Sequence, residues 1–268
     1  MNNYPIGIFD SGIGGLTVAN AISRAMPNEK LIYFGDTAHL PYGEKSKDLI
    51  REYSIGISQF LIEEMQCKAI VVACNTASAA AYEHLRDYYK GRFPIINVID
   101  PIIESLAGNK DLKRIGLIAT NTTIESGVYQ EKLARRIPSA EVKSMATPML
   151  VPMIEEGYAH DDISHALINN YLSNPLLQDI DALILGCTHY PMIRDEINEY
   201  YKGKVRLMDS TDILASKLMD ILEKEEMTAI ERTGENRFMI SDNNPHFDKS
   251  ASRFFKESIN LEFRNIWI

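Results

Sequence analysis

Residues 69–76 read AIVVACNT, and residues 182–189 read ALILGCTH. In both stretches an apolar run leads directly into a cysteine, Cys74 or Cys187, and hydrogen-bonding side chains follow. A short apolar run that ends at polar residues is typical of a strand buried in a parallel sheet. We therefore expect each cysteine at the carboxyl end of a buried strand, close to the start of the next helix.

A second pair of stretches extends this similarity into an internal repeat. Residues 6–11, IGIFDS, resemble residues 115–120, IGLIAT, and the two pairs occur in the same order at similar separations. This pattern predicts a duplicated α/β unit whose halves face each other and contribute equivalent groups to a site between them. Chance similarity between hydrophobic strands is the alternative.

Helical segments separate the apolar runs. Residues 46–65 and 213–222 carry apolar side chains at helical spacing, and Thr122-x-x-Glu125 resembles a capping box that opens a further helix. This alternation of strand and helix predicts an α/β protein with mostly parallel sheets, in which ligands bind beyond the carboxyl ends of the strands. The other strands expected are residues 31–34, 95–99, 205–208 and 238–240, followed by a last helix and strand.

Length and composition exclude several classes of protein. The chain has 268 residues, of which 45% are apolar and 24% charged, as in globular proteins with their own core. Its formal net charge of −9 argues against nucleic-acid and anionic-membrane partners. No apolar run approaches the roughly 18 residues of a membrane span, and residues 1–5 do not resemble a signal or transit peptide. We therefore expect a cytoplasmic protein.

The cysteines and histidines show no pattern of a disulfide framework or a metal site. The three cysteines include no C-x-x-C pair, and the histidines lack metal-ligand spacing, so no metal is expected. The surroundings of Cys67 in the sequence, residues 65–68 (MQCK), show nothing comparable, and Cys67 is interpreted as a small buried side chain. For Cys74 and Cys187, a helix N-terminus would lower the thiol pKa and turn each into a base or nucleophile. The alternative is that both only fill the ends of core strands.

A glycine-rich turn, residues 10–16 with the sequence DSGIGGL, follows the first predicted strand. A dinucleotide motif that begins at Gly12 would require glycine where Thr17 stands, so no nucleotide cofactor is indicated. We expect the backbone N–H groups of the turn to hold a small carboxylate, with Asp10 attracting an ammonium group or moving a proton. The alternative is that Asp10 and Ser11 only cap the following helix.

Polar residues beside the two cysteines are suited to binding an amino acid. Asn75 and Thr76 follow one cysteine, and Thr188 and His189 follow the other, so donors for a carboxylate and acceptors for an amine lie next to both thiols. An ordinary capping role is the alternative for His189. Glu155, taken alone, would be interpreted as part of a solvated helix end.

Four stretches together resemble the glutamate racemases of the aspartate/glutamate racemase superfamily. They span most of the chain in the family's order, whereas the region after about residue 225 matches only loosely. The stretches are residues 8–16 (IFDSGIGGL), 33–43 (YFGDTAHLPYG), 72–78 (VACNTAS) and 185–191 (LGCTHYP).

The resemblance implies a cofactor-independent interconversion of L- and D-glutamate, which supplies D-glutamate for peptidoglycan. By this resemblance Cys74 handles the proton of one enantiomer and Cys187 that of the other. Asp10 matches a residue that assists Cys74, His189 matches one that assists Cys187, and Glu155 matches an auxiliary acid. The positions that match substrate contacts are Asp10, Ser11, Tyr42, Gly43, Asn75, Thr76, Thr123, Thr188 and His189.

The resemblance also implies two pseudo-symmetric α/β domains, residues 1–98 plus 209–268 and residues 99–208, with the site in the cleft between them. Glutamate is the implied small-molecule partner, no cofactor is implied, and a homodimer is one of the family's assemblies. An aspartate or other amino-acid racemase, a decarboxylase of the same fold and a non-catalytic binder of acidic amino acids remain as alternatives.

Overall fold

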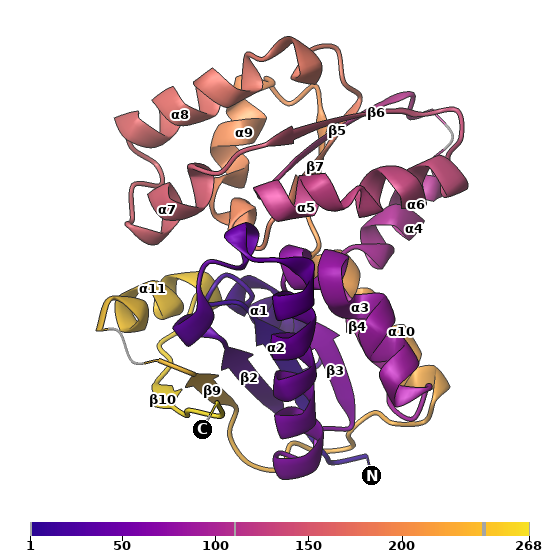
Figure 1. Ribbon diagram of the computed structural model, residues 1–268, viewed down its shortest axis with the longest axis vertical. Coiled ribbons are helices and arrows are strands. Elements are labelled where there is room, and N and C mark those ends of the chain that lie inside the picture. The colour runs from indigo at the N-terminus through magenta and orange to yellow at the C-terminus, as the bar shows by residue number, and fades with distance from the viewer. Residues whose placement is uncertain (1, 110, 243–244, 268) are drawn as a thin grey trace.

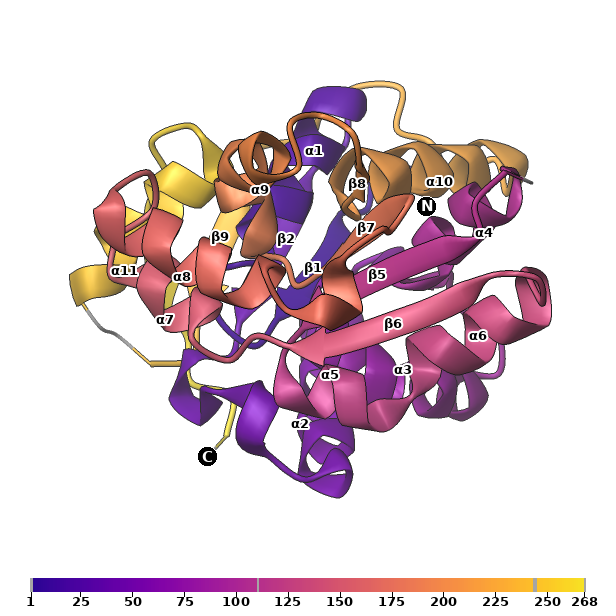
Figure 2. The same cartoon turned by 90° about the horizontal axis from the view of Figure 1, so that it is seen from above.

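The strands of the protein form two parallel sheets, seen in a computed structural model that describes residues 2–109, 111–242 and 245–267 (Figure 1). The first sheet has the order β10-β9-β2-β1-β3-β4, and the second has the order β6-β5-β7-β8. The first contains β1 (Ile6–Asp10), β2 (Leu31–Gly35), β3 (Ala69–Val72), β4 (Ile95–Asn97), β9 (Arg237–Ile240) and β10 (Leu261–Phe263). The second contains β5 (Arg114–Ala119), β6 (Glu141–Ala146), β7 (Ala182–Gly186) and β8 (Arg206–Met208), which lie next to one another in Figure 2.

Helices connect and flank these strands, as the predicted α/β fold requires. The α-helices are α1 (Leu16–Ala25), α2 (Lys47–Gln59), α3 (Asn75–Tyr89), α4 (Asp100–Ala107), α5 (Asn121–Ser126), α6 (Val128–Arg136), α7 (Leu150–Glu155), α8 (Asp162–Leu172), α9 (Arg194–Tyr200), α10 (Thr211–Lys224) and α11 (Pro245–Phe255). Short helical turns are η1 (Thr37–His39), η2 (Tyr42–Glu44), η3 (Phe60–Glu64), η4 (Pro175–Leu177) and η5 (Tyr190–Ile193).

The internal repeat of the sequence corresponds to a repeat of the fold. The strand order β2-β1-β3-β4 in the first sheet matches β6-β5-β7-β8 in the second. The register is equivalent as well, because Ile6 pairs with Ala69 and Ile115 pairs with Ala182. The two halves are therefore pseudo-symmetric, and the carboxyl ends of β3 and β7 occupy equivalent places.

Burial explains which strands the apolar pattern predicted. Strands β1, β2, β3 and β7 are buried along their whole length, as expected where helices cover both faces of a parallel sheet. The prediction missed β6, whose residues are half-buried or exposed at the edge of the second sheet and include polar side chains. A strand with one accessible edge does not need a continuous apolar run.

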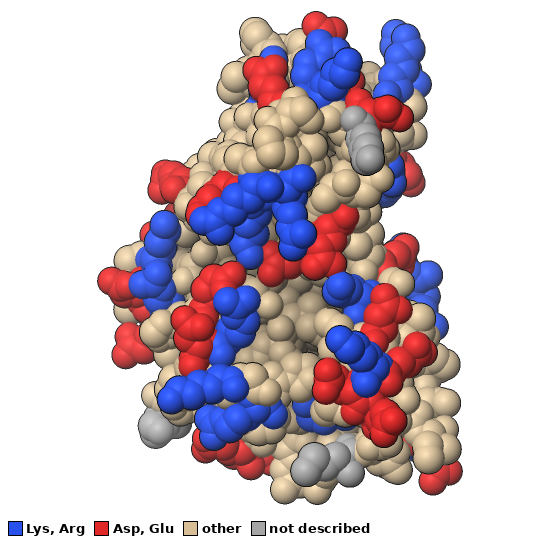
Figure 3. Space-filling view, turned by 90° about the vertical axis from the view of Figure 1, so that its right-hand side faces the viewer, with Lys and Arg blue, Asp and Glu red and all other residues tan. Residues whose placement is uncertain are grey.

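The chain passes from one sheet to the other twice, through α4 and later ahead of α10. In Figure 1, α4 lies near the junction of the halves and α10 runs along the first half. A division into residues 1–98 plus 209–268 and residues 99–208 would give each sheet its own domain; these boundaries stay a prediction. None of the helices that the structure describes combines the length and apolar character of a membrane span. On the face drawn in Figure 3, cationic and anionic side chains are interspersed.

Candidate active site

A cavity of about 350 Å³ lies between the two halves, at the carboxyl ends of the central strands. This is where ligands bind in parallel α/β folds, and the volume suits a small molecule. Both Cys74 and Cys187 line it. The full lining is Asp10, Ser11, Leu40, Pro41, Tyr42, Gly43, Glu44, Cys74, Asn75, Thr76, Thr120, Asn121, Pro148, Val151, Pro152, Glu155, Glu156, Cys187, Thr188 and His189. The structure thus brings together every predicted site residue except Thr123.

The Cys74 thiol lies at the N-terminus of α3, as the sequence predicts. Its Sγ atom accepts a hydrogen bond from the backbone N–H of Ala77 at 3.4 Å and donates to Ser11 Oγ at 3.7 Å. Burial and the nearby Asp10 carboxylate nevertheless raise the pKa of Cys74 to about 12, although the helix N–H group acts in the opposite direction. The helix N–H group thus lowers this pKa as the sequence predicts, but desolvation of the thiolate outweighs it, so the helix does not make Cys74 a thiolate at neutral pH.

The Asp10 carboxylate is held by the glycine-rich turn that follows β1. Asp10 Oδ2 accepts hydrogen bonds from the backbone N–H groups of Gly15, at 2.8 Å, and Gly12, at 3.4 Å. These two amides are therefore occupied by Asp10. A ligand carboxylate would have to bind other N–H groups of the turn, and this binding stays a prediction. Burial raises the pKa of Asp10 above its usual value, even though His189 and the Gly15 amide lower it.

A chain of three side chains extends from the second cysteine. Cys187 Sγ lies 3.6 Å from His189 Nδ1, and His189 Nε2 lies 2.9 Å from Glu155 Oε1. Burial lowers the pKa of His189, but the hydrogen bonds to Cys187 and Glu155 outweigh it, so this pKa lies well above its usual value. An imidazolium beside a sulfur stabilises negative charge on that sulfur. The two cysteines therefore have different surroundings: a carboxylate beside Cys74 and a cation beside Cys187.

The turn after β1 touches the loop after β7 directly. A Cβ atom at Gly14 would lie 2.3 Å from His189 Cε1 and 2.7 Å from Thr188 Oγ1, so only glycine fits there. Next to it, the Thr17 hydroxyl donates to the carbonyl oxygen of Thr188 at 2.9 Å. These contacts fix the Asp10 side of the cavity against the Cys187 side.

A cluster of threonine hydroxyls forms another part of the cavity wall. The Oγ1 atoms of Thr76 and Thr120 are 3.0 Å apart, and Thr123 Oγ1 lies 3.3 Å from Thr76 and 3.0 Å from Thr120. Thr123 is fully buried behind the other two. Thr120, which the prediction missed, lines the cavity in its place. The internal repeat carried the signal, because it aligns Thr120 with Ser11.

The predicted capping box at Thr122 is wrong. Helix α5 begins at Asn121 with Thr120 at the N-cap, and no side chain caps it. The Thr122 hydroxyl instead donates to the carbonyl oxygen of Gly43 at 2.6 Å, across the boundary between the halves. This contact ties α5 to the loop that carries Tyr42 and Gly43.

Half of the remaining lining residues come from the segment around α7: Pro148, Val151, Pro152 and Glu156. The others are Leu40, Pro41, Glu44 and Asn121. The first four lie close to Glu155 in the sequence, Leu40, Pro41 and Glu44 lie close to Tyr42, and Asn121 follows Thr120. Leu40 and Pro41 also belong to the stretch 33–43 that carries the resemblance. Within the described ranges, no group of three or more His, Cys, Asp and Glu side chains is arranged to hold a metal ion.

A family model described as Asp/Glu/Hydantoin racemase matches residues 15–218, which include most of the chain and every cavity-lining residue except Asp10 and Ser11. The chain belongs to this racemase family. Among racemases of the family, the glutamate racemase of Geobacter metallireducens is 40% identical over 93% of this chain and 92% of its own length. The glutamate racemase of Aquifex aeolicus is 43% identical over 84% of this chain and 86% of its own.

Solved racemase structures agree with the fold over the whole chain. The crystal structure of glutamate racemase from Francisella tularensis in complex with D-glutamate has a TM-score of 0.91 at 34% identity, covering 100% of this chain and 99% of that one. The isoform RacE1 from Bacillus anthracis has a TM-score of 0.92 at 31% identity, covering 99% and 98%. The aspartate racemase of Picrophilus torridus, at 20% identity and a TM-score of 0.56, shares the racemase fold only.

Proposed function

We propose that this protein interconverts L- and D-glutamate by a two-base mechanism that uses Cys74 and Cys187. The observation that carries the proposal is that two thiols, at equivalent ends of β3 and β7, line one cavity from opposite halves of a pseudo-symmetric fold. Inversion of a stereocentre requires a base on one face of the α-carbon and an acid on the other, which such a pair supplies. Glutamate is supported by the relatives at 40% and 43% identity.

The proton balance of the reaction follows from the two thiols. A thiolate removes the α-proton from one face of the substrate, which leaves the electron pair on the α-carbon. The thiol on the opposite face then gives its proton to that carbon. One thiolate and one thiol are present before and after, with their positions exchanged, so the state that results is the starting state for the opposite enantiomer.

The surroundings of the thiols support Cys187 as the starting base. The raised pKa of Cys74, about 12, keeps this residue a thiol at neutral pH, whereas protonated His189 stabilises negative charge at Cys187. Asp10, whose pKa is raised by burial, lies beside Cys74 and is suited to accept or return its proton. Glu155 supports the protonated form of His189 through their hydrogen bond.

Stabilisation of the carbanionic transition state is the larger task, and we propose that preorganised donors perform it. Asn75, Thr76 and Thr188 line the cavity next to the thiols and suit the α-carboxylate of the substrate. Ser11, Tyr42 and Gly43 complete the wall on the Cys74 side. Thr123 acts from behind, through its contacts with Thr76 and Thr120.

Three other functions make different demands on the same cavity. An aspartate racemase would require a shallower pocket, and the aspartate racemase structure of Picrophilus torridus is only 20% identical. A decarboxylase needs proton delivery to one face and therefore one cysteine. A non-catalytic binder has no use for the partners that surround each thiol.

We also propose the biological setting that the resemblance implies, in which D-glutamate is made in the cytoplasm for peptidoglycan synthesis. The chain would be divided into two domains, residues 1–98 plus 209–268 and residues 99–208.

A homodimer is the assembly to test, by light scattering at several protein concentrations. A constant monomer mass would contradict it.

Deuterium exchange tests the mechanism. Separately supplied L- and D-glutamate in D₂O would be followed by NMR and optical rotation with the wild-type protein, Cys74→Ser and Cys187→Ser. We expect inversion with α-deuteration in the wild type and opposite directional defects in the two variants. Cys67→Ser changes a buried cysteine outside the cavity and serves as the control. Exchange with aspartate and not with glutamate would make aspartate the substrate. Exchange with neither amino acid would favour the non-catalytic binder.

A further inference from the structure

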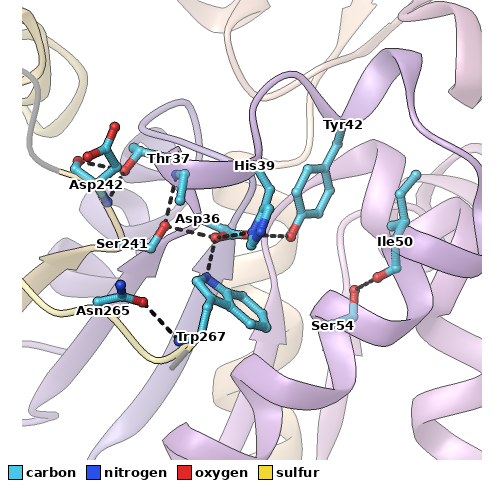
Figure 4. Close-up of polar contacts among 11 residues, drawn as sticks. Asp36, Thr37, His39, Tyr42, Ile50, Ser54, Ser241, Asp242, Asn265 and Trp267 are labelled. Carbon is cyan, nitrogen blue, oxygen red and sulfur yellow. Dashed lines mark hydrogen bonds and ion pairs between the residues drawn. The ribbon is translucent and has the colours of Figure 1, made fainter.

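The Asp36 carboxylate, which has no place in the mechanism above, is fully buried and receives four side-chain donors (Figure 4). Asp36 Oδ2 accepts from the Tyr42 hydroxyl at 2.7 Å, and Oδ1 accepts from Ser241 Oγ at 2.8 Å and Trp267 Nε1 at 2.9 Å. His39 Nδ1 lies within 3.0 Å of both oxygens. A carboxylate offers about four lone-pair sites, so the donors satisfy it.

These donors come from segments that are far apart in the sequence. Asp36 follows β2, and Tyr42 belongs to η2, whereas Ser241 follows β9 and Trp267 lies beyond β10. Two of the four donors therefore belong to the region after residue 225, to which the sequence assigns no role. Paired donors of this kind hold a buried carboxylate in one place, because a lost partner would leave it unsatisfied.

One of the four donors is part of the cavity wall. Tyr42 lines the cavity together with Gly43, and burial, followed by the Asp36 carboxylate, raises the pKa of Tyr42 well above its usual value. The hydroxyl therefore stays protonated and keeps donating to Asp36. On the other side of the same loop, Thr122 donates to the Gly43 carbonyl oxygen.

The indole of Trp267 also packs against the loop that it helps to hold. Its ring lies edge-on to His39 at 4.8 Å and to Tyr53 at 5.4 Å between centroids. The His39 ring in turn stacks on Tyr53 at 3.9 Å. Hydrogen bonding and ring packing thus connect Trp267 to both η1 and η2.

We propose that Asp36 is a positioning residue that holds Tyr42 and Gly43 in the wall of the substrate cavity, and that Ser241 and Trp267 set the place of Asp36. The C-terminal segment then determines how well glutamate binds. This inference deepens the proposed function and rests on it, because it concerns the same cavity.

Kinetics of three variants test the inference. Trp267→Phe keeps an aromatic ring and removes the N–H donor, and Ser241→Ala removes the second donor. We expect each to raise KM for glutamate about threefold to tenfold, the size of one hydrogen bond, with kcat within about twofold. When Trp267→Phe or Ser241→Ala is combined with Tyr42→Phe, KM should rise by less than the two single increases together predict, because all three residues act through Asp36.

The matched control is Arg264→Ala. Arg264 lies in the same C-terminal segment but pairs with Glu64 on the surface, at 2.9 Å, and does not reach Asp36. Its KM should stay at the wild-type value. An equal increase in KM in Trp267→Phe and Arg264→Ala would overturn the inference, since general packing of the segment would then explain both increases. Fully additive effects on KM in the double variants with Tyr42→Phe would overturn the inference as well.

Fluorescence provides a readout that does not depend on racemisation. Trp267 is the single tryptophan of the sequence, so tryptophan emission reports the surroundings of this residue. Tyr42→Phe should shift the emission maximum of the unliganded protein, and unchanged emission would contradict the linkage. If the wild type does not racemise glutamate, the proposed function fails, and the emission shift then decides the Asp36 linkage by itself.

Discussion

The hydroxyl of Tyr129, on α6 of the second half, donates a 2.7 Å hydrogen bond to the Oδ1 atom of Asn75, a cavity residue of the first half. Tyr129 is fully buried, and burial keeps its pKa far above neutral, so it remains a donor. The Nδ2 atom of Asn75 is buried and has no hydrogen-bond partner in the part of the chain that the structure describes. Tyr129 therefore fixes the orientation of the Asn75 amide in the cavity wall.

Tyr129→Phe should weaken substrate binding without removing a catalytic group. The amide of Asn75 would lose its fixed orientation, and we expect KM for glutamate to rise about tenfold, as for loss of one hydrogen bond in a site. Steady-state kinetics measures this change. Tyr201→Phe is the control, because its hydroxyl bonds the carbonyl of Leu177, away from the cavity. Equal KM values in both variants would contradict the role of Tyr129.

The raised pKa of His189 predicts a pH dependence with a defined sign. The histidine is more easily protonated in the folded chain, so its contribution to stability is complete below the unfolded value of about 6.5 and is lost as pH rises through the folded value. Racemisation that begins at Cys187 should likewise decline on the alkaline side. In His189→Asn we expect this alkaline limb to disappear and the rate to fall about 10²–10⁴-fold. An unchanged pH–rate profile would count against the assignment.

Thiol labelling should distinguish the three cysteines. Burial raises the pKa of Cys67 and Cys74 to about 12 each, and only thiolates react readily with iodoacetamide. At pH 7.5 we expect Cys187 to be alkylated first, as measured by peptide mass spectrometry. His189→Asn should slow that reaction because the neighbouring cation is lost. Faster labelling of Cys74 in the unliganded protein would reverse the proposed starting state.

Gly14→Ala should disrupt the contact between the two halves of the site. The new Cβ atom would lie 2.3 Å from His189 and cannot be accommodated without moving that ring. We expect a loss of about 1–3 kcal/mol in the free energy of unfolding and a larger loss of activity than of stability. Gly108→Ala, where the nearest atom is Ser105 O at 3.5 Å, is the control and should change neither. Denaturant titration and racemisation assays on both variants would decide.

Much of the fold could be predicted because its signals are local. Buried parallel strands require continuous apolar runs, and the runs at 6–9, 69–73 and 182–185 correspond to β1, β3 and β7. The internal repeat even indicated which residues occupy equivalent places, since Cys74 and Cys187 follow matching strands. Strand β6 was missed because an edge strand tolerates polar residues. The Thr122 capping box failed because α5 already begins at Asn121 and the Thr122 hydroxyl donates to the Gly43 carbonyl oxygen instead.

The sequence by itself determined the α/β class and the duplication, and it placed Cys74 and Cys187 at the ends of equivalent strands, because these features depend on apolar periodicity and on two similar stretches of sequence. Only the tertiary structure decided the chemistry around them. The raised pKa of Cys74 depends on burial and on Asp10 from another strand, and the orientation of Asn75 depends on Tyr129 from the other half. Desolvation and hydrogen bonding act between groups that are close in space, and no local pattern records which distant residues will become neighbours.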